Sequence, residues 1–165
     1  MEFVEGQVID MATMQSSHAV AMDLIDAALR RMFGIGYYVR QRKPFVIPNS
    51  SEPEPEPDVA VVQGLIRDYT EAHPSTAKLL VEVADTTTLL YDRDVKGSLY
   101  AKASVPEYWV LNLGDRQLEV YSDPETDATA AYGFSYNSYQ LYKSGQAAAP
   151  FGIVAHAIAI EDVLP

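Results

Sequence analysis

Two short apolar runs constrain the fold of this chain more than any other feature of its sequence. Residues 59–62 read Val-Ala-Val-Val, and residues 78–84 read Lys-Leu-Leu-Val-Glu-Val-Ala. Short apolar runs bounded by loop residues are typical of strands that are buried on both faces of a sheet. The second run contains Glu82, and a carboxylate inside a buried strand requires a charged partner or a bound cation.

The rest of the chain supplies helices and further strands around these two runs. We predict a helix with Ser16 or Ser17 as its N-cap that stops at Gly34, because apolar residues recur at helical spacing between them. A second helix is predicted over residues 92–103, with Asp92 in the capping position. The other predicted elements are a hairpin over residues 3–11, strands over 37–47, 107–112 and 117–122, a short helix over 65–72, a strand or hairpin over 131–142 and a strand-like tail over 152–165.

Composition excludes several classes of protein. The chain has 165 residues, of which 48% are hydrophobic, so we expect a single globular domain over residues 1–165. The mean hydropathy of −0.08 and the lack of a long apolar stretch predict no membrane association, and the N-terminus does not resemble a signal peptide. The chain has no cysteine, which removes disulfides, thiolate metal sites and cysteine nucleophiles and favours a cytoplasmic location.

The formal net charge is −11, which should repel a polyanion such as DNA from the molecule as a whole. The acidity is local, because residues 1–50 hold five acidic and five basic side chains and residues 51–165 carry all of the excess. Repeated Glu-Pro pairs in residues 48–57 predict a stiff, extended loop. Arg40, Arg42 and Lys43 precede this acidic loop and are candidates to line a groove.

Three charged residues occupy positions where structure alone would not place them. Asp58 opens the first buried strand, Glu82 lies inside the second, and Lys96 lies on the helix that follows. Two carboxylates with a strand carbonyl and waters suit Mg²⁺ or Mn²⁺, and a lysine beside them would neutralise charge on a phosphate. Each residue also has a structural interpretation. Asp58 is a candidate cap for the turn after the Glu-Pro loop, Glu82 is a candidate partner for an arginine across the sheet, and Lys96 is a candidate surface ion pair with Asp92.

The order of these residues resembles a known family, the Uma-two type of restriction endonuclease, from about Val4 to Tyr121. The matching segments are residues 4–8 (Val-Glu-Gly-Gln-Val), 54–61 (Glu-Pro-Glu-Pro-Asp-Val-Ala-Val), 82–86 (Glu-Val-Ala-Asp-Thr), 91–96 (Tyr-Asp-Arg-Asp-Val-Lys), 99–101 (Leu-Tyr-Ala) and 105–110 (Val-Pro-Glu-Tyr-Trp-Val). That family is placed in the PD-(D/E)-x-K nuclease superfamily. The resemblance therefore implies an α/β fold with a restriction-endonuclease-like core, in which helices flank a mixed sheet and the metal site lies at one edge.

The resemblance also implies roles for individual residues. Asp58 and Glu82 would bind the metal together with the backbone carbonyl of Val83. The superfamily pattern asks for a lysine two residues after Glu82, where this chain has Ala84. In the family the lysine is taken to have moved to the following helix, where Lys96 matches.

Four further residues of the matching segments are accessory candidates. Glu5 would add a carboxylate to the site, although it also suits a hairpin turn. His18 would contact a phosphate or a metal-bound water, although it also suits capping or packing at a helix start. Tyr91 and Arg93 would hold Lys96 or touch the substrate. Tyr100 matches as well, but core packing is the better interpretation.

The leading functional hypothesis is an endonuclease that uses Mg²⁺ or Mn²⁺ to hydrolyse DNA phosphodiester bonds, with Asp58 and Glu82 holding the metal and Lys96 stabilising the transition state. A catalytically inactive binding or assembly module with the same fold is the alternative, motivated by Ala84 and the acidic surface. Hydrolysis of a smaller phosphoester is a third possibility. Because of the net charge we expect weak, salt-sensitive DNA binding. A homodimer is expected by analogy of fold, since two related sites can address two strands.

Overall fold

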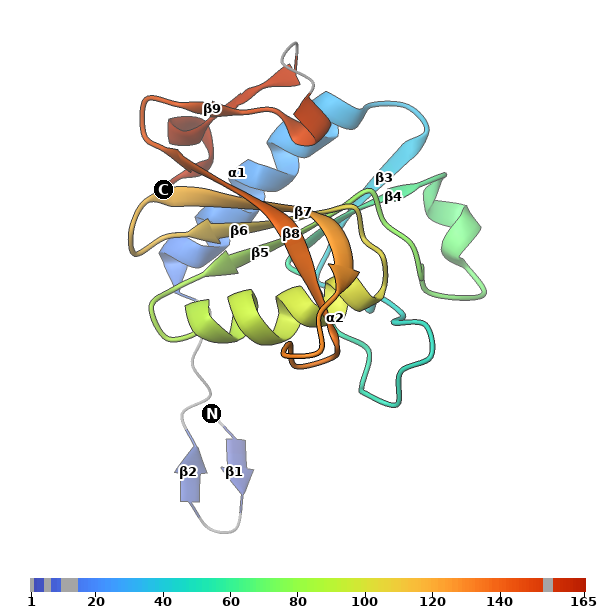
Figure 1. Cartoon of the computed structure of the whole chain (residues 1–165). Helices are drawn as coiled ribbons and strands as arrows, with labels where there is room; N and C mark the ends of the chain where they lie inside the picture. Colours follow the sequence, from blue (N-terminus) through green and yellow to red (C-terminus); the bar gives the residue numbers. More distant parts are fainter. Residues whose placement is uncertain (1, 5–6, 10–14, 153–155) are drawn as a thin grey trace.

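The computed structural model describes residues 2–4, 7–9, 15–152 and 156–165. Within them, a six-stranded mixed sheet has the order β3-β4-β5-β6-β7-β8. Strands β5 and β6 run parallel, and the other neighbouring pairs are antiparallel. The strands are β3 (Tyr37–Gln41), β4 (Val59–Gln63), β5 (Leu79–Ala84), β6 (Glu107–Asn112), β7 (Gln117–Thr126) and β8 (Phe134–Lys143). The expected α/β fold with a mixed sheet between helices is confirmed (Figure 1).

Helix α1 (Ser16–Phe33) covers one face of the sheet. Its buried side chains Ile25 and Leu29 pack with the residues of the central strands that point toward the helix, such as Val81 and Val83 of β5. The helix stops at Gly34, whose φ of 58° suits glycine, as predicted. The predicted serine cap is wrong, because the residue in the N-cap position is Gln15, whose side chain makes no capping hydrogen bond.

A second helical segment covers the opposite face (Figure 1). It begins at residue 89 and comprises a π-helical turn, η2 (Tyr91–Lys96), and helix α2 (Gly97–Lys102). The prediction that Asp92 caps this helix is wrong. Asp85 takes that position instead, since its Oδ1 accepts hydrogen bonds from the backbone N–H groups of Thr87 and Thr88 at 2.8 and 3.0 Å. Asp92 lies inside the helical segment and is buried.

The alternation of the central strands explains how one sheet serves two cores. In β5, Leu79, Val81 and Val83 face α1, whereas Leu80 and Ala84 face α2. Side chains in a strand alternate between the two faces, so Glu82 lies on the α2 face among apolar neighbours. The two buried strands predicted from the apolar runs are therefore confirmed, and their only interruption is the glutamate.

Short elements complete the described residues. They are the antiparallel strands β1 (Glu2–Val4) and β2 (Gln7–Ile9), the 3₁₀ turns η1 (Ile66–Tyr69), η3 (Pro150–Gly152) and η5 (Ile160–Val163), and the antiparallel pair β9 (Ala147–Ala148) and β10 (Ile158–Ala159). The strand-like tail is mostly wrong, because residues 160–163 form a 3₁₀ turn whose Ile160 and Val163 pack under α1. No helix within the described ranges has the length and apolar character to cross a membrane.

Candidate active site

The antiparallel pairing of β4 with β5 brings the two predicted carboxylates together. Val59 is opposite Val81 in this pairing, so Asp58, one residue before β4, lies at the end of β5 that carries Glu82 and Val83. Asp58 Oδ2 accepts a hydrogen bond from the backbone N–H of Val83 at 2.8 Å. The Glu-Pro loop therefore ends on a side chain that is fixed directly to the neighbouring strand.

Glu82 is 2% exposed and has two side-chain partners. Tyr100 donates its hydroxyl to Glu82 Oε1 at 2.7 Å, and Lys96 Nζ lies 3.0 Å from Oε2. Burial raises the pKa of Glu82 to about 8, because Lys96 and Tyr100 offset only part of the cost of removing the charge from water. Its partner is a lysine from the facing helix and not an arginine across the sheet, so that interpretation of Glu82 is wrong.

Lys96 bridges two buried carboxylates. Its Nζ lies 3.0 Å from Glu82 and 3.1 Å from Asp92 Oδ1, and 5.9 Å from the centre of the Tyr91 ring. Burial opposes its charge, but the two carboxylates outweigh burial and raise the pKa of Lys96 above its usual value. The ion pair with Asp92 exists, yet it is not an ordinary surface pair, because both carboxylates are nearly fully buried.

Ala84, the position where the superfamily pattern has its lysine, is fully buried in the α2-side core. Leu80, Leu99 and Val110 belong to the same cluster. A lysine at position 84 would have to enter this apolar cluster, whereas Lys96 reaches Glu82 from the helix above it. The structure thus places Lys96, the lysine that the resemblance predicts, next to Glu82, and it does so from the helical segment and not from the strand that carries Glu82.

His18 lies on the other side of Asp58. Its Nε2 is 2.8 Å from the carbonyl oxygen of Val83 and 3.4 Å from Asp58 Oδ2, and its Nδ1 is buried with no hydrogen-bond partner among the described residues. The hydrogen bond with Asp58 raises the pKa of His18. Although burial favours the neutral acid, the hydrogen bonds from His18 and Val83 outweigh it and lower the pKa of Asp58. Asp58 is therefore ionised at neutral pH, and its pKa is shifted in the opposite direction from that of Glu82.

These groups line one cavity of about 630 Å³ between the start of α1 and the η2 turn. Its wall includes the predicted residues Asp58, Glu82, Val83, Lys96, His18 and Tyr91. Arg42 also lines it, with a left-handed backbone (φ 46°) whose N–H donates to the carbonyls of Pro57 and Asp58 at 3.1 and 3.2 Å. Arg40 does not contribute to a groove, because it is 3% exposed and its guanidinium lies near the rings of Tyr38 and Tyr69.

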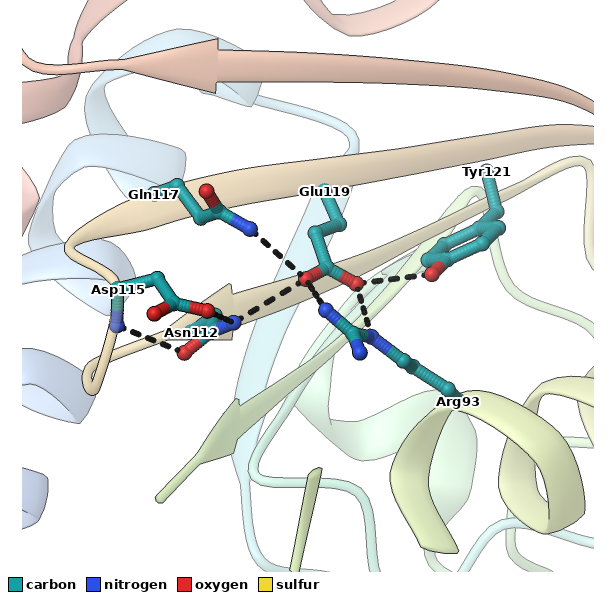
Figure 2. Close-up of polar contacts among 6 residues, drawn as sticks. All are labelled: Arg93, Asn112, Asp115, Gln117, Glu119 and Tyr121. Carbon is teal, nitrogen blue, oxygen red and sulfur yellow. Dashed lines mark hydrogen bonds and ion pairs between the residues drawn. The ribbon is translucent and has the colours of Figure 1, made fainter. Parts of the chain in front are cut away.

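Arg93 faces away from this cavity. Its guanidinium pairs with the buried Glu119 of β7, to which Asn112, Gln117 and Tyr121 also donate hydrogen bonds (Figure 2). Arg93 therefore neither touches Lys96 nor lines the cavity, which corrects the direct role expected of it. Glu5 lies outside the described residues.

The sequence predicted the contacts of two residues only in part. Asp92 was interpreted as a cap and as a surface ion-pair partner of Lys96, and Tyr100 as core packing, yet both are buried and contact the Lys96–Glu82 pair. The signal for Asp92 was present, because Asp92 and Lys96 are four residues apart and such side chains share one helix face. Tyr100 carried no comparable signal, since a tyrosine that follows Leu99 in a buried helix is ordinarily a core residue.

The donors around the cavity are of the kind that Mg²⁺ and Mn²⁺ prefer. Asp58 and Glu82 supply carboxylate oxygens and Val83 a carbonyl oxygen. No group of three or more histidine, aspartate or glutamate side chains is arranged as a metal site in the part of the chain that the structure describes. The set is thus two carboxylates and a main-chain oxygen, which fits an ion that keeps several waters better than a closed cage.

Comparison with solved structures finds a similar fold. The structure is similar to a crystal structure described as a putative nuclease belonging to DUF820 from Anabaena variabilis, with a TM-score of 0.65, 11% sequence identity, and coverage of 97% of this chain and 87% of that one. None of the curated proteins searched matches the sequence. The sequence does match the Uma2 family, described as "Putative restriction endonuclease", over residues 1–141, and the chain belongs to that family.

Proposed function

We propose that residues 1–165 form one nuclease domain that hydrolyses DNA phosphodiester bonds with the help of Mg²⁺ or Mn²⁺. The observation that carries this proposal is the position of Lys96, a half-buried ammonium shared by the buried carboxylates of Glu82 and Asp92, at the cavity that Asp58 lines. Buried charges at a cavity are expensive for the fold, and such clusters mark functional sites. The family membership supports a nuclease in general.

In this proposal Asp58, Glu82 and the Val83 carbonyl hold the divalent ion. When bound, the ion supplies Lewis-acid stabilisation of the phosphate and a more acidic water. Lys96 stabilises the negative charge that develops on the phosphate oxygens while a water oxygen bonds to phosphorus and the bond to the leaving oxygen breaks. Tyr100 and Asp92 keep Glu82 and Lys96 in place through the hydrogen bond and ion pair described above.

His18 and Tyr91 have supporting roles in the proposed site. His18 lies within reach of Asp58 and of the Val83 carbonyl, so it orients the proposed ligands and contacts a phosphate or a bound water. Tyr91 is 56% exposed at the cavity edge, where its ring faces the Lys96 ammonium. Both side chains therefore line the cavity beside the proposed metal ligands.

Arg42 is the proposed contact for a neighbouring phosphate. Its backbone is hydrogen-bonded to the carbonyl of Asp58, so its side chain starts beside the proposed ligands and lines the same cavity. The surrounding acidity still makes DNA binding weak and salt-sensitive. We expect Arg42→Ala to weaken binding uniformly across sequences and to lower the slope of log affinity against log salt by about one ion.

The test is cleavage of plasmid and single-stranded DNA with Mg²⁺ or Mn²⁺, with and without a chelator. We expect cleavage that the chelator stops and that Asp58→Asn and Glu82→Gln abolish. Glu107→Gln is the matched control, because Glu107 is a buried glutamate at the other end of the same sheet, where it binds Trp109 and the backbone of Phe151. Intact DNA under conditions that support related nucleases, with no effect of the chelator, would refute the proposal.

The second candidate is a binding or assembly module that keeps the nuclease fold without turnover. The observations that favour it are that Lys96 is already paired with Glu82 and Asp92, and that the chain has alanine and not lysine at position 84. Titration calorimetry separates the two candidates. A module need not bind Mg²⁺ or Mn²⁺, and Asp58→Ala combined with Glu82→Ala would leave its binding unchanged.

A homodimer and a cytoplasmic location are part of the proposal. Two sites related by a two-fold axis would address the two strands of a duplex. The absence of cysteine fits a reducing compartment such as the cytoplasm. Light scattering at micromolar concentration tests the dimer, and a monomeric mass would rule it out.

A further inference from the structure

The η2 turn holds two sheet carboxylates at once. Lys96 pairs with Glu82 of β5, and Arg93, three residues earlier on the same turn, pairs with Glu119 of β7. Val110 of β6 lies between them, because it is opposite Glu82 on one side and opposite Glu119 on the other. The two glutamates therefore belong to one row across the sheet, and one helical turn spans that row.

Protein donors hold both carboxylate oxygens of Glu119. It is fully buried, and Arg93 donates through both Nε, at 2.8 Å from Oε2, and Nη2. Tyr121 donates to Oε2 at 2.8 Å, and Asn112 and Gln117 each donate to Oε1 at 3.3 Å (Figure 2). These donors fix both the position and the rotation of the carboxylate, so the planar guanidinium of Arg93 has one geometry in which to dock.

The backbone of the same turn is also held. The carbonyl of Asp92 accepts the N–H of Gly97, in the i to i+5 pattern of a π-helix, and the hydroxyl of Tyr108 at 2.9 Å. Such π-helical turns are rare and concentrate at functional sites. Here the turn lets Asp92 and Lys96 reach the cavity while Arg93, between them in sequence, points to β7.

We propose that Glu119 is a positioning residue, which docks Arg93 so that the η2 turn presents Lys96 to Glu82. This inference rests on the proposed function for its effect on catalysis. Glu119 touches neither the cavity nor Lys96, and its action passes through the helical turn alone. A displacement of about 1 Å at a reacting group is enough to slow catalysis by up to about a hundredfold.

The first test is the variant Glu119→Gln, which keeps the shape of the side chain and removes the charge that Arg93 docks on. We expect kcat to fall about tenfold to a hundredfold while KM stays within about twofold, since Glu119 contacts no substrate. Arg93→Lys, which keeps the charge and loses the two-pronged geometry, should reproduce the loss of kcat. Tyr121→Phe removes one donor and leaves Arg93 in place, so its effect should be smaller.

A second readout does not depend on activity. The Lys96 amine is protected by its two ion pairs, so acetylation by a succinimidyl ester followed by mass spectrometry reports whether Lys96 remains docked. In Glu119→Gln we expect the labelling rate of Lys96 to rise about tenfold, because the charged pair that closes the turn is lost. Lys102 on α2 is the internal reference, and its labelling should not change.

Asp26→Asn is the matched control. Asp26 is a buried carboxylate that Arg30 contacts through Nε at 2.6 Å, as Arg93 contacts Glu119, but both residues lie on α1 at the opposite face of the sheet. The control should lower the melting temperature without a selective change in kcat or in Lys96 labelling. If Glu119→Gln behaves like Asp26→Asn in both readouts, the positioning role is refuted. If the wild-type protein cleaves nothing, the proposed function fails, and the labelling experiment still decides whether Glu119 docks Lys96.

Discussion

Two buried glutamates on one face of the sheet differ in almost everything except burial. Glu119 accepts hydrogen bonds from Arg93, Tyr121 and two amide side chains, which outweigh burial and lower its pKa. Glu82 has Tyr100 and a lysine that it shares with Asp92, and burial raises its pKa to about 8. The same helical turn supplies the cation in both cases.

The difference in hydrogen-bonding indicates that one carboxylate has a structural role and the other can bind a ligand. A carboxylate whose lone pairs are filled by protein donors has nothing left to offer a ligand, and it serves best as a fixed point. A carboxylate that is buried, incompletely compensated and at a cavity gains more from a divalent ion, because the ion replaces a proton that burial forces on it. Glu119 is the first kind and Glu82 is the second.

The largest expected effect is on the cleavage rate, and it comes from breaking the Lys96–Glu82 ion pair. Lys96→Met keeps most of the unbranched side chain and removes the charged Nζ, and we expect the cleavage rate to fall about a thousandfold, because a preorganised charge at the phosphate is lost. Single-turnover cleavage of a labelled duplex measures this. The control is Lys102→Met on α2, a residue that lines no part of the cavity. Equal rates for Lys96→Met and the wild type would remove Lys96 from the mechanism.

The second effect concerns the free energy of unfolding. We expect the loss of the Arg93–Glu119 pair to lower it more than the loss of the Lys96–Glu82 pair. Arg93→Ala leaves an ionised carboxylate buried without its charged partner, at an expected cost of about 3 kcal/mol in the free energy of unfolding. Lys96→Met should cost less, about 1 kcal/mol, because Glu82 takes up a proton when its cation is gone. Urea unfolding of both variants at pH 7 measures the two costs. If the losses of stability are equal, the two carboxylates do not differ as described.

The sequence predicted one of these glutamates and not the other, for a physical reason. Glu82 is conspicuous because apolar residues surround it in a strand that no water reaches. Glu119 sits in Gln-Leu-Glu-Val-Tyr, an alternation that is equally typical of a strand with one solvated face, so its burial depends on the helix that covers β7. The sheet, its long helix and the pairing of Asp58 with the Glu82 strand were likewise predictable from local patterns and from the family resemblance.

The predictions that were wrong concern positions where two residues suit the same role, or where contacts between distant segments determine burial. Asp92 and Asp85 both suit the N-cap of the same helix, and Asp85 is the cap because the backbone N–H groups of Thr87 and Thr88 donate hydrogen bonds to it. Arg40 was expected in a groove because charge favours the surface. Its aromatic neighbours Tyr38 and Tyr69 instead hold it inside, and that contact joins β3 to a turn distant in sequence.

A third effect, smaller than the cost of Arg93→Ala, tests the raised pKa of Glu82 directly. A carboxyl group with a pKa of about 8 in the folded protein, against the usual 4.5, keeps a proton that the unfolded chain has released. Its contribution to stability is complete below about pH 4.5 and is lost as the pH rises toward 8, by up to about 1.4 kcal/mol per pH unit. Glu82→Gln carries no such proton, so its stability relative to the wild type should improve by about 2 kcal/mol between pH 5.5 and 7.5.

Glu119→Gln is the control for the pH dependence of the stability of Glu82→Gln. Because the pKa of Glu119 is lowered, its linkage to folding lies at acid pH, below the usual range of a glutamate, and its effect on stability should be constant between pH 5.5 and 7.5. Urea unfolding of both variants and the wild type at the two pH values is sufficient. If the two substitutions show the same pH dependence, Glu82 is as fully compensated as Glu119, and a divalent ion would have no proton to displace.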